Sequence, residues 1–113
     1  MKKKILFICT SNVVRSPTCE DILKDSLLYE TKSAGTASHA IVRVTQEMID
    51  WADIIVVMCE RTDKHLTYLK ENFTVRSKQI YDLDVEDFIY IKKNQPELLK
   101  ILRKKLKKYF ILT

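Results

Sequence analysis

The pattern of apolar and polar positions predicts strands that alternate with helices along the chain. Continuous apolar runs rich in isoleucine and valine are typical of strands buried on both faces, whereas apolar residues spaced three or four positions apart indicate helices. By these criteria we expect strands at residues 5–8, 31–34, 54–58 and 79–83. We expect helices at residues 17 to about 29, 45–51, 61 to about 72 and 96–110. Such alternation predicts an α/β fold with a parallel sheet and right-handed crossovers.

The first and last predicted helices carry apolar faces that indicate how they pack. The first helix places on one side Cys19, Ile22, Leu23 and Leu27. The last helix directs toward the core Leu98, Leu99, Leu102, Leu106 and Tyr109. Its other positions include Lys100, Arg103, Lys104, Lys105, Lys107 and Lys108. We interpret this basic side as the solvated face of an amphipathic helix.

The net charge of +5 resides largely on that basic face. No aromatic residues interleave its charges as stacking platforms, so we expect no nucleic-acid partner. A positive field of this kind favours anionic substrates.

Length and composition favour one domain spanning residues 1–113, with an ordinary hydrophobic content of 46%. Apolar runs fall well short of the roughly 18 residues of a membrane span, and the opening segment is too short for a signal peptide. We therefore expect no membrane partner. Three cysteines without paired or metal-ligand spacing predict free thiols, no structural zinc and a cytoplasmic location.

The segment from Cys9 to Pro17, C-T-S-N-V-V-R-S-P, is the strongest candidate for chemistry. Cys9 follows the first strand, and Arg15 stands where the first helix is expected to begin. A helix N-terminus and a loop of successive N–H groups both bind anions, and arginine grips phosphate oxygens with a bidentate fork. The same field favours a thiolate, which is a nucleophile. The segment therefore predicts a phosphate site with Cys9 as the attacking group.

The two residues after Arg15 indicate how the helix starts. A residue before proline is biased away from helical angles, and proline suits the first helical position. Ser16 is therefore expected to be the N-cap before Pro17, with its hydroxyl near the Cys9 sulfur.

With these residues in place, the chain resembles the low-molecular-weight protein tyrosine phosphatases, in a short variant. Their loop has the form C-x5-R-S, usually C-x-G-N-x-C-R-S-P, and the matching positions are Cys9, Asn12, Arg15, Ser16 and Pro17. Three further segments match the family in order. They are S-A-G-T at 33–36, W-A-D-I-I-V-V-M at 51–58, and L-D-V-E-D-F at 83–88 followed by P-E-L at 96–98.

The resemblance implies a three-layer sandwich in which a four-stranded parallel sheet of order 2-1-3-4 carries helices on both faces. It implies hydrolysis of a phosphorylated substrate, phosphotyrosine or another aryl phosphate, through a phosphocysteine on Cys9. Arg15 would hold the phosphoryl oxygens and Asp87 would be the general acid, with Asp84 as a rival and Asp82 less favoured. The implied phosphate-binding residues are Thr10, Ser11, Asn12, Val13, Val14, Arg15 and Ser16. Neither a metal nor a cofactor is implied, and the oligomeric state is left open.

Three positions depart from the family pattern. Ser11 replaces the usual loop glycine, which predicts strain if that position needs a positive φ. Val14 replaces a second loop cysteine, so no disulfide with Cys9 across the loop is available. Glu86 replaces a proline in the acid loop, which predicts a looser loop.

Two other functions remain open from the sequence. A thiol-dependent arsenate reductase would use the same loop but needs two further relay cysteines, and only Cys59 lies downstream. A non-catalytic phosphate or phosphopeptide binder would need no thiol. The two histidines, His39 and His65, have no partner pattern and are interpreted as surface or helix residues.

Overall fold

Four parallel strands form the central sheet of the molecule. The structure is a computed structural model, and it describes residues 2–86 and 92–112. The strands are β1 (Lys3–Cys9), β2 (Tyr29–Gly35), β3 (Ile54–Val57) and β4 (Gln79–Asp82). They lie in the order β2-β1-β3-β4, and each neighbouring pair is parallel. The predicted strand order and α/β class are confirmed.

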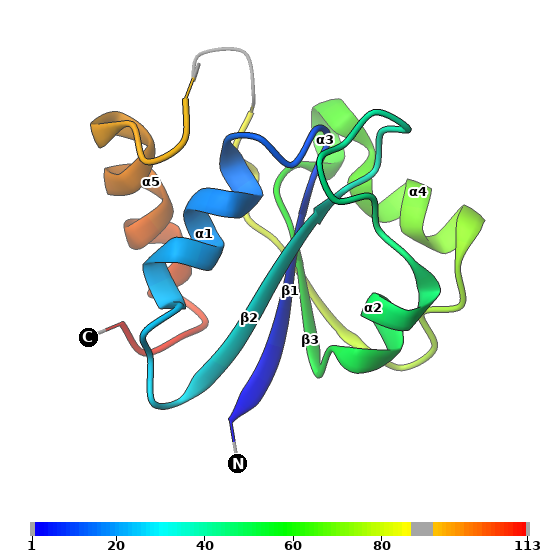
Figure 1. The fold of residues 1–113 in the computed structure, drawn as a ribbon, viewed down its shortest axis with the longest axis horizontal. Helices are drawn as coiled ribbons and strands as arrows, with labels where there is room; N and C mark the ends of the chain where they lie inside the picture. The colour runs from blue at the N-terminus through cyan, green and yellow to red at the C-terminus, as the bar shows by residue number, and fades with distance from the viewer. Residues whose placement is uncertain (1, 87–91, 113) are drawn as a thin grey trace.

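Helices cover both faces of this sheet, which confirms the predicted three-layer sandwich. They are α1 (Arg15–Leu23), α2 (Gln46–Trp51), α3 (Glu60–Asp63), α4 (His65–Asn72) and α5 (Pro96–Leu106). Figure 1 shows α1 and α5 on one side of the strands and α2, α3 and α4 on the other. None of the helices within residues 2–86 and 92–112 has the length and apolar character needed to cross a bilayer.

The alternation of side chains along β1 divides the core in two. Ile5 and Phe7 belong to the cluster beneath α1 and α5, whereas Leu6 and Ile8 belong to the cluster beneath α2 and α4. All four side chains are fully buried. A central strand buried on both faces is the arrangement that its continuous apolar sequence predicts.

Helix α1 is shorter than predicted. It begins at Arg15 and ends at Leu23, where the Ser26 N–H bonds the Leu23 carbonyl at 3.0 Å and the Ser26 hydroxyl accepts from the Leu28 N–H. This serine turn competes with the helical ladder and leads the chain into β2. The prediction that Leu27 faces the core is therefore wrong: it lies beyond the helix and is 89% exposed.

The last helix also ends early, at Leu106. Leu98, Leu102 and Leu106 are fully buried as predicted, but Tyr109 is 40% exposed. Phe110 takes the core position instead, and its ring meets Tyr29 edge-on at 5.4 Å between centroids.

The helix predicted at 61–72 is two helices that meet at Lys64. Lys64 has a left-handed backbone, with φ 56°, which ends α3 and precedes α4. The break changes the chain direction so that His65, the first residue of α4, is buried at the end of β3.

The sheet topology places Cys9 at the point where ligands bind in open α/β sheets. The chain leaves β1 toward β2 on one side, and β3 lies on the other. Ligands bind at the carboxyl ends of strands where the order reverses in this way. Cys9 is the last residue of β1 and is almost completely buried.

Candidate active site

The loop from Cys9 to Arg15 is shaped by bonds to its outward-facing carbonyls. The carbonyls of residues 9, 10 and 11 accept hydrogen bonds, at 3.0 to 3.2 Å, from the N–H groups of Thr36, Ala37 and Ile41. In a planar trans peptide the N–H points away from the carbonyl. The N–H groups of residues 10, 11 and 12 therefore turn to the inner side of the loop, as an anion cradle requires.

Gly35, the chain's single glycine, allows this close approach. A Cβ atom at that position would lie 2.4 Å from the Thr10 carbonyl oxygen and 2.7 Å from the Ala40 Cβ. The S-A-G-T match thus has a physical reason: the end of β2 lies against the backbone of the phosphate loop.

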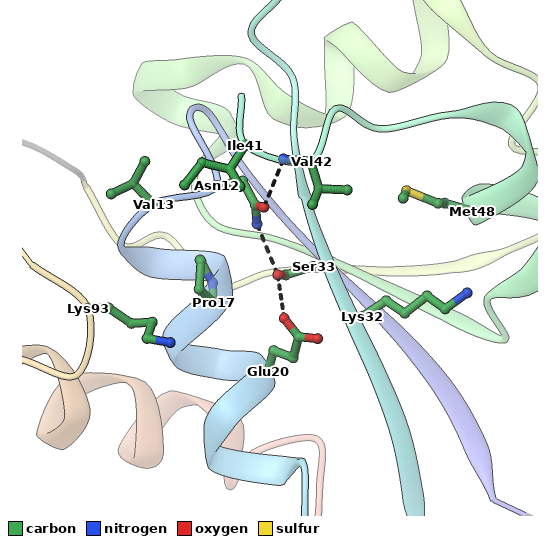
Figure 2. Close-up of a pocket in the computed structure, with 10 residues that line it drawn as sticks. All are labelled: Asn12, Val13, Pro17, Glu20, Lys32, Ser33, Ile41, Val42, Met48 and Lys93. Carbon is green, nitrogen blue, oxygen red and sulfur yellow. Dashed lines mark hydrogen bonds between the residues drawn. The ribbon is translucent and has the colours of Figure 1, made fainter. Parts of the chain in front are cut away.

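Asn12 braces the loop from behind. Its backbone is left-handed, with φ 57°, and its amide group donates to Ser16 at 3.0 Å and to Ser33 at 2.9 Å. Its carbonyl oxygen accepts from the Val42 N–H at 3.2 Å. Ser33 in turn donates to Glu20 at 2.6 Å, and Figure 2 shows the bonds that run from Val42 through Asn12 and Ser33 to Glu20. The bracing role implied for Asn12 has these contacts behind it.

The strain predicted for Ser11 does not arise. Positive φ within the loop belongs to Asn12, and Ser11 is not among the described residues that have it. Asparagine tolerates the left-handed region better than most residues, so the positive φ falls on a residue that suits it.

Ser16 is buried and contacts Cys9, the predicted nucleophile. Its Oγ lies 2.9 Å from the Cys9 Sγ. A thiolate carries no proton, so the Ser16 hydroxyl is the donor whenever Cys9 is ionised. The predicted N-cap role is wrong, because the helix already begins at Arg15 and Val14 occupies the cap position.

Arg15 has a buried side chain that ties three loops together. It is only 1% exposed, and its Nη1 donates at 2.8 Å both to Asp63 Oδ2 and to the Val85 carbonyl. Its Nη2 donates to Thr10 Oγ1 at 3.3 Å. These partners follow β1, β3 and β4, so the guanidinium is fixed at the carboxyl edge of the sheet.

His65 is a buried site residue that the sequence interpretation missed. Its Nε2 lies 3.0 Å from Thr10 Oγ1, and its Nδ1 accepts the Cys59 N–H at 3.1 Å. Burial, and next the Arg15 charge, lower the pKa of His65 to about 4. The signal available in the sequence was helical spacing, because His65 lies four residues before the buried Leu69. His39 is exposed as predicted, 3.2 Å from the Ser11 hydroxyl.

The three aspartates considered as the general acid differ in their surroundings. Asp87 lies outside the described residues. Asp84 is half exposed and paired with Arg61 at 3.1 Å. Burial raises its pKa, but hydrogen bonds from Cys59 and Arg61 outweigh that effect and lower it. A general acid needs the opposite shift. Asp82 is exposed at the end of β4.

The two remaining thiols are both buried. Cys19 is a buried residue of α1 that contacts the Met58 sulfur at 3.9 Å, and burial raises its thiol pKa well above the usual value. Cys59 follows β3, where its sulfur accepts from Thr62 and donates to Asp84.

An open, largely apolar pocket of about 590 Å³ lies beside the loop. Its apolar wall includes Val13, Ile41 and Val42, which are 46%, 72% and 38% exposed. Lys32 and Lys93 line the same pocket, and Figure 2 shows them on either side of α1 and β2.

Comparisons with known proteins point to one family. Residues 4–52 match the family model described as low molecular weight phosphotyrosine protein phosphatase. A search of curated protein sequences gives no match.

Solved structures of related proteins share the fold over nearly the whole chain. A low molecular weight protein tyrosine phosphatase from T. tengcongensis is 22% identical, with a TM-score of 0.69 over 95% of this chain and 99% of its own. The Vibrio vulnificus protein Wzb, solved with benzylphosphonate, is 20% identical, with a TM-score of 0.75 over 96% and 97%. An arginine phosphatase from Geobacillus stearothermophilus is 21% identical, with a TM-score of 0.65 over 98% and 99%.

The family match covers the segment that holds Cys9, Arg15 and the bracing network of Asn12. The resemblance read from the sequence is thus confirmed: in residues 4–52 the chain matches the low-molecular-weight phosphotyrosine protein phosphatases, and over nearly its whole length it has their fold.

Proposed function

We propose that this protein is a cysteine-dependent phosphomonoesterase that hydrolyses phosphotyrosine or a related aryl phosphate. The observation that carries the proposal is the arrangement around Cys9. A buried thiol stands 2.9 Å from a hydroxyl donor, under inward-facing N–H groups, in a loop closed by a buried arginine. Pure binding of phosphate needs no thiol in that position, so the arrangement favours catalysis over a binding module.

The proposed reaction has two displacements. The Cys9 thiolate attacks phosphorus, a sulfur–phosphorus bond forms, and the bond from phosphorus to the leaving oxygen breaks. The leaving oxygen takes a proton from the general acid. Water then attacks the phosphorus of the phosphocysteine and gives a proton to the carboxylate that the general acid has become. The sulfur–phosphorus bond breaks, which releases inorganic phosphate and the thiolate. Arg15 and the loop N–H groups stabilise the charge on the phosphoryl oxygens in both steps.

We propose Asp87 as the general acid, on the strength of the family resemblance. The alternatives are less suited: Asp84 is paired with Arg61 and its pKa is lowered, although burial alone would raise it. Glu86 is also paired with Arg61. Arg61 thus engages the two carboxylates on either side of Val85.

The apolar wall beside the loop supports an aromatic leaving group. Val13, Ile41 and Val42 offer exposed apolar surface next to Asn12. A tyrosine ring gains by burying area there, whereas a guanidinium group would lose hydration. We therefore place phosphotyrosine ahead of phosphoarginine, the substrate class suggested by the arginine phosphatase among the structural neighbours.

Hydrolysis of para-nitrophenyl phosphate between about pH 5 and 8 tests the proposal. The range is wide because the reaction needs an ionised thiol and a protonated acid at the same pH. We expect turnover by the wild type and none by Cys9→Ser, with inorganic phosphate still bound by the variant. Cys19→Ala is the matched control: it removes a buried thiol that contacts the Met58 sulfur, and it should leave turnover unchanged.

Two results would redirect the proposal. A folded wild-type protein that binds phosphate without turnover would favour a binding module. Reduction of arsenate that depends on Cys59 would favour the thiol relay of an arsenate reductase. Parallel assays with phosphotyrosine and phosphoarginine peptides decide whether the substrate is a phosphate ester or a phosphoramidate.

We also propose that the protein acts in the cytoplasm as a single domain. All three cysteines are free thiols, as expected for a reducing compartment.

A further inference from the structure

We propose that His65 is a positioning residue for the phosphate-binding arginine, and that it acts through the Thr10 hydroxyl. The inference rests on the proposed function, because it assigns a role in the same site. It follows from a continuous line of hydrogen bonds that runs from the backbone of Cys59 through His65 and Thr10 to Arg15.

The direction of each bond is set by the first one. The Cys59 N–H donates to Nδ1 of His65 at 3.1 Å, so Nδ1 carries no proton. A neutral imidazole with a bare Nδ1 has its proton on Nε2. Nε2 is 3.0 Å from Thr10 Oγ1, and the imidazole is therefore the donor in that bond.

The surroundings keep this tautomer in place. The His65 side chain is fully buried, and burial together with the Arg15 charge lowers its pKa to about 4. The Asp63 carboxylate, 3.8 Å from Nε2, and Glu60 act to raise this pKa but do not outweigh the lowering. Protonation would also put a proton on Nδ1, directly against the Cys59 N–H. His65 thus remains a neutral donor throughout the pH range in which a phosphatase of this kind is assayed.

Thr10 receives a second donor from the opposite side. Arg15 Nη2 approaches the same hydroxyl oxygen at 3.3 Å. A hydroxyl rotates freely until its partners fix it, and here the imidazole fixes which side of the oxygen faces the arginine. Because the Thr10 oxygen accepts both of these bonds, its own O–H proton remains able to donate to a third group.

This contact complements the two on the other amino group of Arg15. Nη1 is held by Asp63 and by the Val85 carbonyl, both at 2.8 Å. The Thr10 oxygen adds a contact at Nη2, and this contact links the guanidinium to His65. A planar fork binds phosphate only when its plane is correctly set.

Two substitutions at His65 separate this role from a structural one. In His65→Gln the side-chain amide reaches toward the Nε2 position and can donate to Thr10, but it gives up the bond to Cys59. In His65→Asn the shorter amide reaches only the Nδ1 position, where its oxygen accepts from Cys59, and the bond to Thr10 is lost.

We expect His65→Asn to bind inorganic phosphate about tenfold more weakly than the wild type, and His65→Gln to stay within about threefold of it. The value of kcat/KM for para-nitrophenyl phosphate should follow the same order. A purely structural role predicts the reverse, because Gln, which loses the backbone bond, should then be the weaker and less thermally stable variant.

Thr10 supplies an independent test that avoids the buried imidazole. Thr10→Ser keeps the hydroxyl and should bind phosphate more tightly than Thr10→Val, which keeps the shape without the oxygen and should resemble His65→Asn. His39→Asn is the matched control, because His39 also faces a loop hydroxyl but is exposed and has no link to Arg15. It should leave phosphate binding unchanged.

Phosphate titration and turnover keep the two proposals apart. Wild-type protein that binds phosphate but does not hydrolyse the ester would overturn the proposed function. The phosphate affinities of the variants would still decide the role of His65. Equal phosphate affinity in His65→Asn and His65→Gln, or in Thr10→Val and Thr10→Ser, would overturn the role of His65.

Discussion

Asn12 combines a left-handed backbone with a side chain that braces the loop. Its backbone is left-handed, its amide nitrogen donates to Ser16 and Ser33, and its amide oxygen accepts from the Val42 N–H. Aspartate would fit the same backbone but could offer no proton to either serine. The loop therefore depends on the amide group itself and not only on a residue that tolerates positive φ.

The charge state of His65 makes stability depend on pH. Its pKa is about 4 in the folded protein, against 6.5 for the unperturbed group, because burial and the Arg15 charge disfavour protonation. Above pH 6.5 the residue is neutral in both states. As the pH falls below 6.5, His65 binds a proton in the unfolded chain but stays neutral in the folded protein. The free energy of unfolding should then drop by about 2 kcal/mol between pH 7 and pH 5.

Urea denaturation of the wild type and of His65→Gln at these two pH values measures this contribution. Both proteins carry the same carboxylates, so we assign the difference between their pH responses to His65. The wild type should lose about 2 kcal/mol more than the variant. Parallel pH responses would show that His65 is not protonated on unfolding.

At the scale of elements, the end of β2 and the phosphate loop form one unit. The segment at 36–41 bonds the outer carbonyls of the loop, and Gly35 lets the two backbones touch. The cradle is thus a property of the contact between β1 and β2 as much as of the C-x5-R sequence.

Gly35→Ala should disrupt this unit. The added Cβ would meet the Thr10 carbonyl at 2.4 Å, and a backbone atom inside a bonded loop cannot yield cheaply. We expect a loss of roughly 1–3 kcal/mol in the free energy of unfolding and weaker binding of inorganic phosphate. Thermal denaturation and phosphate titration measure the two effects.

A double variant sharpens this test. Adding Ala40→Gly removes the other close contact, with the Ala40 Cβ at 2.7 Å, but leaves the clash with Thr10. Phosphate binding should therefore remain weak in Gly35→Ala/Ala40→Gly. Full recovery would place the problem at Ala40 and not at the phosphate loop.

The elements that the sequence predicted well are those with strong local patterns. The buried strands and the amphipathic last helix follow from apolar spacing. Thr45 caps α2, because its side-chain oxygen accepts a hydrogen bond from the Met48 N–H. The break at Lys64 was missed, because a lysine in the left-handed region carries no local signal. That break is also what buries His65, so the missed element and the missed site residue have one cause.

At the scale of the whole molecule, the site is assembled from distant parts of the chain. Cys9 and Arg15 come from the first strand and helix, Asp63 and His65 follow β3, and Val85 follows β4. The nucleophile and the arginine could be read from one short motif. Their partners could not, since only the sheet order brings these strand ends together.

The proposed acid comes from the same distant segment, and its substitution should affect esters unequally. Asp87→Asn should slow phenyl phosphate, whose leaving group needs a proton, at least about tenfold more than an ester with a highly acidic phenol. A series of aryl phosphates with the same variant measures this slope, and the wild type is the reference. Equal slowing across the series would exclude Asp87 as the acid, and Asp84→Asn would then be the next variant.

The bond from Arg15 to the Val85 carbonyl spans 70 positions of sequence. A link of such length closes late, because the ends of a long loop meet only after the intervening segments are in place. During folding, Cys9 can therefore reach its place in β1 before the Arg15 guanidinium is oriented. That orientation has to wait until β3 and β4 have joined the sheet. Catalytic competence should thus return during refolding together with the last strand, and not with the segment that carries the nucleophile.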